Sequence, residues 1–166
     1  MIQSNQKEKI RLKAVSGLAK AVLKDLGCRD NAELSILLTD NKGIQELNKR
    51  YLKKDKPTDV LSFSMYEIPL SVSVVRVRKN TVTEYGHGSR FLLGDIVISI
   101  ETAKTQAKED GVALYEEIAR LLIHGILHLF GFDHEKSSKE AQRMKKEEER
   151  LLEIAKCKMQ NANRRL

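Results

Sequence analysis

The first third of the chain shows helical and extended patterns of hydrophobic residues in turn. The positions at helical spacing are Val15, Leu18, Val22, Leu26, Ile44, Leu47 and Tyr51. The first four, followed by a glycine, predict a helix over residues 6–26. An aliphatic run predicts a strand over 33–39, and the turn formers at 40–43 predict a turn after it. A short helix over 44–51 is then expected, because the residues before Pro57 disfavour a longer one.

The middle of the chain is rich in aliphatic and β-branched residues, which favour strands. Residues 60–65 and 72–77 each predict a strand, and the second leads to a glycine pair at Gly86 and Gly88. A continuous aliphatic run predicts another strand over 96–100 that is buried on both faces. This last strand is therefore expected in the centre of a sheet.

Three more helices are predicted after residue 100. Residues 101–109 form a polar helical segment, and 113–130 are apolar almost all round, as in a buried helix. Ser137 and Glu140 have the spacing of a capping box and open a highly charged helix over about 137–160, with a loose tail after it. Because the chain has 166 residues and shows no repeats or long linkers, a single domain over 1–166 is expected.

Composition adds a positive charge that is concentrated in two segments. The net charge is +7 and the calculated pI is about 9.4. Residues 49–56 carry a net charge of +4, and residues 76–90 a net charge of +3. The cations of the first segment are Lys49, Arg50, Lys53, Lys54 and Lys56. This pattern fits a polyanionic partner such as nucleic acid, or simply a solvated basic surface.

Hydropathy gives no sign of a membrane segment. The sequence has no run of about 18 uncharged apolar residues, and its first nine residues are polar. A cytoplasmic protein without membrane association is therefore expected, and a monomer is taken as its state.

Three of the four histidines fall within eleven residues, at His124, His128 and His134. His124 and His128 are one helical turn apart, so both imidazoles project from the same face of the predicted helix. Gly131 can adopt a positive φ and turn the chain back, which brings His134 toward the same point. Asp133 is placed either to orient one of these rings or simply to form the turn.

Three histidines in so apolar a segment need partners, either one shared metal ion or hydrogen bonds within a core. Zinc is the expected ion, because imidazole suits it and three protein ligands leave a fourth position open, as in catalytic sites. Nickel, iron or copper would also suit such a group. The spacing matches the histidines and glycine of the HExxHxxGxxH metalloproteases, but Gly125 stands where their catalytic glutamate belongs. A metalloprotease is therefore the weakest hypothesis.

The run from His124 to His134 also resembles the hallmark HGxLHLxGyDH of the YbeY family of bacterial endoribonucleases. A second family block, an Asn and a Tyr leading into a charged turn and then PTDVLSF, is similar to Asn48, Tyr51, Asp55 and the run from Pro57 to Phe63. A third block, LGDIVIS, matches Leu93 to Ser99. Three blocks in the family's order make a coincidence very improbable.

The resemblance implies an α+β fold, with a small mixed β-sheet packed with about five helices and a metal site at the end of a buried helix. It implies a zinc-dependent, single-strand-specific endoribonuclease that acts in 16S rRNA 3′-end maturation and ribosome quality control. Its partners would be ribosomal RNA, the 30S subunit and assembly factors. His124, His128 and His134 would act through the metal, with no separate base assigned. The cations that would contact RNA phosphates are Arg50, Lys53, Lys54 and Lys56.

The chain departs from the family at one position with a chemical role. Members usually carry Arg directly after the Tyr of the second block, and here that position is Leu52. Arg50 and Lys53 lie close by, but Arg50 points in another direction on a helix and an ammonium does not replace a guanidinium freely. The alternative hypothesis is therefore a ribosome-assembly RNA-binding factor with a largely structural zinc. Residues 64–92 match no family pattern, and His87 among them is interpreted as a solvated residue.

Overall fold

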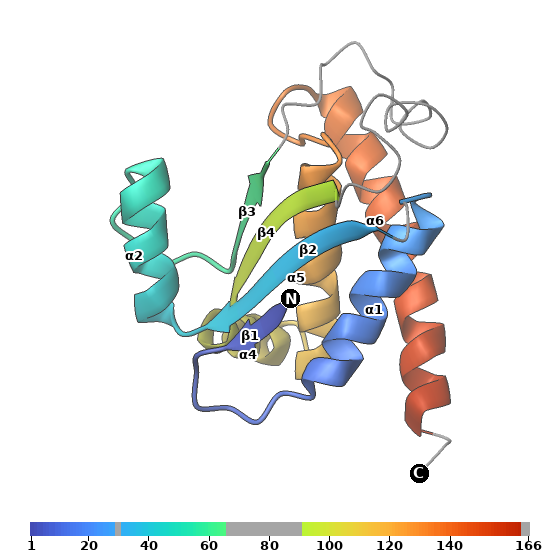
Figure 1. Ribbon diagram of the computed structural model, residues 1–166, viewed down its shortest axis with the longest axis horizontal. Helices are drawn as coiled ribbons and strands as arrows, with labels where there is room; N and C mark the ends of the chain where they lie inside the picture. The colour runs from blue at the N-terminus through green and yellow to red at the C-terminus, as the bar shows by residue number, and fades with distance from the viewer. Residues whose placement is uncertain (29–30, 66–90, 164–166) are drawn as a thin grey trace.

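The computed structural model describes residues 1–28, 31–65 and 91–163. The strand expected at 72–77, the glycine pair, His87 and the tail after residue 163 lie outside these ranges. The described part is a four-stranded mixed sheet packed with five helices, so the predicted α+β class is confirmed (Figure 1). The elements, in chain order, are β1 (Ile2–Ser4), α1 (Leu12–Asp25), β2 (Ala32–Thr39), α2 (Asn41–Leu52), β3 (Val60–Ser64), β4 (Phe91–Ser99), α4 (Ile100–Glu109), α5 (Leu114–Leu129) and α6 (Ser138–Asn163).

The sheet has the strand order β1-β2-β4-β3. β1 and β4 both run parallel to β2, and β3 pairs with β4 in the antiparallel sense. β4 lies between β2 and β3, and its residues Ile96, Val97 and Ile98 are all buried. The expected central strand is therefore present, since side chains from both faces of β4 are covered.

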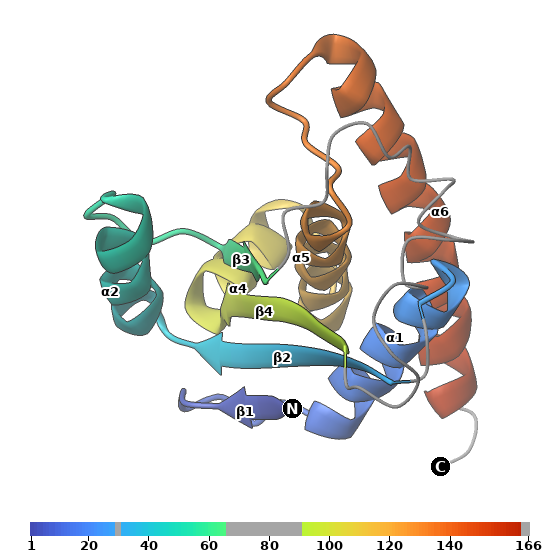
Figure 2. The ribbon, with the colours of Figure 1, turned by 45° about the horizontal axis from the view of Figure 1, so that its top comes forward.

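The two faces of the sheet are covered unequally (Figure 2). On one face, alternate residues of β2 and β4 join α1, α5 and α6 in the main core, with Ile36, Ile98 and Leu127 almost fully buried. On the other face, α2 covers a smaller cluster built from Ile44, Leu61 and Val97. Figures 1 and 2 show β3 between α2 and α5, and the carboxyl ends of both helices lie at the same end of the sheet.

The N-terminal prediction was wrong in two respects. The first residues form the edge strand β1, which pairs with β2. Two backbone hydrogen bonds flank this pairing, from Asn5 to the carbonyl of Leu38 and from Ile36 to the carbonyl of Met1. The helix expected from residue 6 begins only at Leu12. A three-residue polar edge strand has no alternation to reveal it, because its pairing partner lies more than thirty residues away.

Two further boundaries differ from the prediction for local reasons. The turn expected at 40–43 is the start of α2, where the Asp40 carboxylate caps the helix by accepting from the backbone of Gly43. The strand expected at 96–100 already begins at Phe91, and Ile100 belongs to α4, which Ser99 caps. Asp and Ser favour turns and helix N-caps alike, so sequence alone does not separate the two.

No helix in the described ranges combines the length and the apolar character needed to cross a membrane.

Gly94 allows β3 and β4 to approach closely, and we expect its replacement by alanine to destabilise the fold by about 2 kcal/mol. Its φ is +148°, and an added Cβ would lie 2.3 Å from the backbone oxygen of Phe63. Gly17, inside α1 with nothing near its missing Cβ, is the matched control. Gly17→Ala should instead stabilise the protein by about 0.5–1 kcal/mol, because it removes a helical glycine. Urea unfolding measures both changes, and a Gly94→Ala variant as stable as the original chain would contradict the close approach.

Candidate metal centre

The three clustered histidines meet at the carboxyl end of α5. His124 and His128 lie one turn apart on its half-buried side. The helix ends at Phe130, and Gly131 has a φ of +81°, as the sequence predicted. The backbone N–H groups of Gly131 and Phe132 donate to the carbonyls of His128 and Leu127, which closes the helix. The chain then turns back and brings His134 to the other two rings.

The geometry of the three rings suits a single ion. One ligand nitrogen from each of His124, His128 and His134 lies within 4.8 Å of the others. The Nε2 atoms of His124 and His128 are 3.0 Å apart. Zn–N bonds of about 2.1 Å in a tetrahedral site put neighbouring nitrogens about 3.4 Å apart, so small rotations of the rings suffice. The group can therefore hold a metal ion, and its three donors leave one position of a tetrahedron open.

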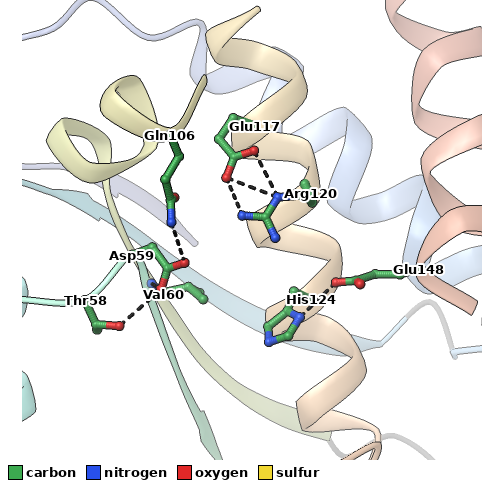
Figure 3. A network of polar contacts seen from close by, with 8 residues as sticks. All are labelled: Thr58, Asp59, Val60, Gln106, Glu117, Arg120, His124 and Glu148. Atoms are coloured by element: carbon green, nitrogen blue, oxygen red, sulfur yellow. Dashed lines mark hydrogen bonds and ion pairs between the residues drawn. The ribbon is translucent and has the colours of Figure 1, made fainter. Parts of the chain in front are cut away.

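Glu148 of α6 fixes the orientation of His124 (Figure 3). The Nδ1 atom of His124 lies 2.8 Å from a carboxylate oxygen of Glu148. An ionised carboxylate accepts hydrogen bonds but cannot donate them. Nδ1 therefore carries the proton, and the lone pair of Nε2 faces the other histidines. A carboxylate behind a metal-binding histidine is a recurrent arrangement that sets the tautomer of the ring and raises its basicity.

His128 is kept in the form that a metal requires. Burial, and then the neighbouring His124 and His134, lower the pKa of His128 below its usual value. Its ring is therefore neutral at pH 7, and a neutral imidazole is the metal-binding species.

Asp133 lies close enough to His128 for its charge to oppose the lowering of the pKa of that ring, and its own hydrogen bond lies in a turn. Its carboxylate accepts from the backbone N–H of Glu135 at 2.9 Å and lies 3.5 Å from the ammonium of Lys136. These contacts belong to the turn between α5 and α6. The residue that hydrogen-bonds a histidine of the group is Glu148, which sequence reasoning missed.

A buried ion pair lies one turn before His124 on α5. The carboxylate of Glu117, which is 2% exposed, accepts from Nε of Arg120 through both oxygens, at 2.9 and 3.1 Å. Figure 3 shows Arg120 and His124 on the same side of the helix. The guanidinium of Arg120 is held by a carboxylate of its own helix. The ion pair therefore keeps the Arg120 side chain in a defined position next to the metal centre.

The residues before β3 form a second polar cluster near the centre (Figure 3). Asp59 accepts from Thr58, from its neighbour's backbone at Val60 and, at 3.1 Å, from Gln106 of α4. Burial opposes ionisation of Asp59, yet these hydrogen bonds keep its pKa below the usual value. Thr58 and Asp59 thus tie the start of β3 to α4.

Gly125 is packed so closely against β4 that a side chain at this position would require its neighbours to shift. The residue is buried, and an added Cβ would lie 3.1 Å from the side chain of Ile96 in β4. A side chain at this position would point into the main core and away from the three rings. The structure thus gives a steric reason, besides the missing carboxylate, against proteolysis by the HExxH route.

The basic cluster lies at the carboxyl end of α2 and in the loop that follows. Its members, all exposed, are Arg50, Lys53, Lys54 and Lys56. Lys49 beside them is already engaged, because its ammonium lies 2.6 Å from the carboxylate of Asp55. Lys53 ends the helix in a left-handed conformation and donates to the carbonyl of Arg50. The carboxyl ends of α2 and α5, which carry part of the cluster and the metal centre respectively, lie on opposite sides of β3 at the same end of the sheet (Figures 1 and 2).

We expect Glu148→Ala to weaken zinc binding about 10- to 100-fold, because Nδ1 of His124 loses its acceptor and the ring its fixed tautomer. Competition with a chromophoric chelator measures the affinity. Glu149→Ala is the matched control, since Glu149 is the next residue of α6 and is exposed. Equal zinc affinities of the two variants would contradict the role of Glu148.

Fold and site together describe an α+β protein in which three histidines at the end of a core helix could hold a metal ion. Comparison with known sequences identifies its family. The family model described as Endoribonuclease YbeY matches residues 1–156. The chain belongs to the YbeY family, as its three sequence blocks predicted.

Curated relatives agree with this assignment. Endoribonuclease YbeY of Aquifex aeolicus is 44% identical over 147 residues, which cover 89% of this chain and 85% of the relative. Endoribonuclease YbeY of Persephonella marina is 47% identical, over 81% of this chain and 77% of the relative. The chloroplastic endoribonuclease YBEY of Arabidopsis thaliana is 42% identical over 78% of this chain, although the match covers only 20% of that longer protein.

A solved structure supports the fold. The solution structure of TM1509 from Thermotoga maritima is similar to this chain with a TM-score of 0.61 and 23% sequence identity, over 98% of this chain and 93% of that protein.

Proposed function

We propose that the chain is a zinc-dependent endoribonuclease that cleaves single-stranded RNA, acting in 16S rRNA 3′-end maturation and ribosome quality control. The observation that carries this proposal is the group of His124, His128 and His134 in a chain of the YbeY family. Two relatives that are 44% and 47% identical to it over the matched residues are named endoribonucleases. Its partners would be ribosomal RNA, the 30S subunit and assembly factors, and it would act in the cytoplasm as a monomer.

Each residue of the centre has a defined part in this proposal. The three imidazoles would hold the ion, Glu148 would keep the Nε2 lone pair of His124 directed at it, and the burial of His128 favours its neutral form. When bound, zinc supplies Lewis-acid stabilisation of phosphoryl charge and acidifies a bound water. We assign no separate general base.

The basic cluster would supply the contacts to the RNA backbone. Phosphates attract exposed Lys and Arg side chains regardless of sequence, and these contacts position the strand. Arg50 and Lys53 are at the carboxyl end of α2, and this end of the helix lies at the same end of the sheet as the carboxyl end of α5, which carries the metal centre. A strand held there would need only to cross β3 to reach the histidines.

Leu52 favours a second candidate, a ribosome-assembly RNA-binding factor in which zinc is largely structural. Its side chain is 48% exposed at the end of α2, where the family usually presents a guanidinium. Leucine offers no hydrogen bond to a phosphate, and Arg50 lies two residues away, on another side of the helix.

One experiment separates the two candidates. Zinc-loaded and metal-stripped protein are incubated with single-stranded and duplex fragments of ribosomal RNA, while bound zinc and circular dichroism are recorded. The nuclease is expected to cut the single strand only in the zinc form, with both forms folded. A zinc-loaded, folded protein that binds RNA without cutting it would support the assembly factor instead. Precursor 30S particles as substrate test the proposed site of action.

A further inference from the structure

Exposed apolar side chains gather at the end of α2 and β3, next to the basic cluster. Tyr51 is 57% exposed, Leu52 is 48% exposed and Met65 is 54% exposed. Single exposed apolar residues are common on proteins, but neighbouring ones often mark a binding surface. Met65 follows directly after β3, and Phe63 lies within it. We call Tyr51 and Phe63, whose rings contact each other, the aromatic surface.

The ring of Tyr51 is supported from behind. Its centroid lies 5.2 Å from that of Phe63, with the ring planes at 59°. Phe63 in turn packs against the small core of Ile44, Leu61 and Val97 beneath α2. A ring supported in this way loses little freedom when a ligand binds its exposed side, which favours tight binding.

The charge around the aromatic surface distinguishes between its potential partners. Arg50, Lys53, Lys54 and Lys56 lie within five residues of Tyr51 in the chain and are exposed, whereas Lys49 is paired with Asp55. The centre of a protein–protein interface is usually depleted of lysine. An aromatic ring among cations is instead the combination that binds single-stranded nucleic acid, because bases stack on the ring and phosphates meet the cations.

We propose that Tyr51, supported by Phe63, stacks an unpaired nucleobase of the RNA whose phosphates contact the basic cluster. This inference rests on the proposed function and explains physically why the protein would select single-stranded over duplex RNA. In an A-form duplex the faces of the bases are stacked on each other and the deep major groove excludes side chains, so Tyr51 meets a free base only in a single strand.

The absence of tryptophan from the sequence permits a direct optical test. Tyr51→Trp introduces a single indole, and its emission is followed in the full chain while a single-stranded oligoribonucleotide is added with a chelator present. Val112→Trp is the control, because Val112 is exposed near the opposite end of α5 from His128. Stacking predicts that the single strand quenches the emission of the Tyr51→Trp variant and that inorganic polyphosphate does not. The emission of the Val112→Trp variant should stay unchanged with either addition.

A pair of substitutions measures the contribution of the ring to affinity. Tyr51→Ala should weaken binding of the single strand about tenfold, whereas Tyr51→Phe should bind it as the original chain does. Both variants keep the exposed cations, but only Tyr51→Phe keeps an aromatic ring. Thermal unfolding checks that both variants fold. Equal affinities of these two variants, or equal quenching of the Tyr51→Trp variant by RNA and polyphosphate, would overturn the inference.

The outcome is independent of cleavage. Binding is measured with the metal removed, so a chain that stacks RNA but never cuts it would leave this inference standing and overturn the proposed nuclease. Conversely, metal-dependent cutting by a Tyr51→Ala variant with unchanged affinity would overturn the stacking role alone. A surface that serves a protein partner would leave the emission of the Tyr51→Trp variant unchanged by RNA, and this result also counts against the proposal.

Discussion

His124→Ala is expected to lose stoichiometric zinc and to reduce RNA cleavage by more than about a hundredfold. The substitution removes one of three imidazole nitrogens, and even residues that only support a metal ligand contribute about 10- to 100-fold. Elemental analysis of the purified protein and a cleavage assay on single-stranded RNA measure the two effects. His87→Ala is the matched control, because His87 is the one histidine of the sequence outside the group.

The control sharpens the result in two ways. His87→Ala should keep both zinc and cleavage, in line with the interpretation of His87 as a solvated residue. A His124→Ala protein that stays folded, as judged by circular dichroism, while losing both properties would favour the nuclease over the assembly factor. Full zinc content in His124→Ala would contradict the assignment of the metal centre.

Arg120→Met should lower the free energy of unfolding by about 3 kcal/mol, which is the largest effect on stability that we expect. The substitution leaves the carboxylate of Glu117 with 2% exposure and without its guanidinium partner. Removing one member of a buried ion pair costs about 3–5 kcal/mol, and the lower value applies because Arg120 is itself 38% exposed. Urea denaturation measures the change.

Two further variants test whether an unpaired buried charge causes the loss of stability in Arg120→Met. Lys156→Met breaks an exposed pair with Glu153 on α6 and should change stability by less than about 0.5 kcal/mol. The double variant Glu117→Met with Arg120→Met should recover most of the loss, because no unpaired charge then remains in the core. A double variant as unstable as Arg120→Met alone would show that packing rather than charge carries the effect.

The sequence predicted those parts of the site that depend on local geometry. Helical spacing fixes the relation of His124 to His128, and the positive φ of Gly131 returns the chain to His134 within a few residues. These relations need no knowledge of distant contacts. The class of fold was implied by the resemblance to the family, and the predicted order of elements was compatible with it.

The parts that sequence reasoning missed depend on long-range contacts. Glu148 is one of three consecutive glutamates on a charged helix, and only the packing of α6 against α5 selects it as the partner of His124. The edge strand β1 is defined by pairing with Ile36 and Leu38 rather than by its own pattern. The cap at Asp40 was mistaken for a turn because the same side chain serves both structures.

The setting of the metal centre on α5 has a practical consequence. Ten residues of this helix are buried, among them Leu122, Ile126 and Leu127, so two of the three ligands stand on a segment that the main core already holds in place. Small zinc modules, in contrast, lose their fold when the ion leaves. We therefore expect removal of the ion to be reversible. The apoprotein should keep its native fold, and added zinc should restore the metal centre without a refolding step.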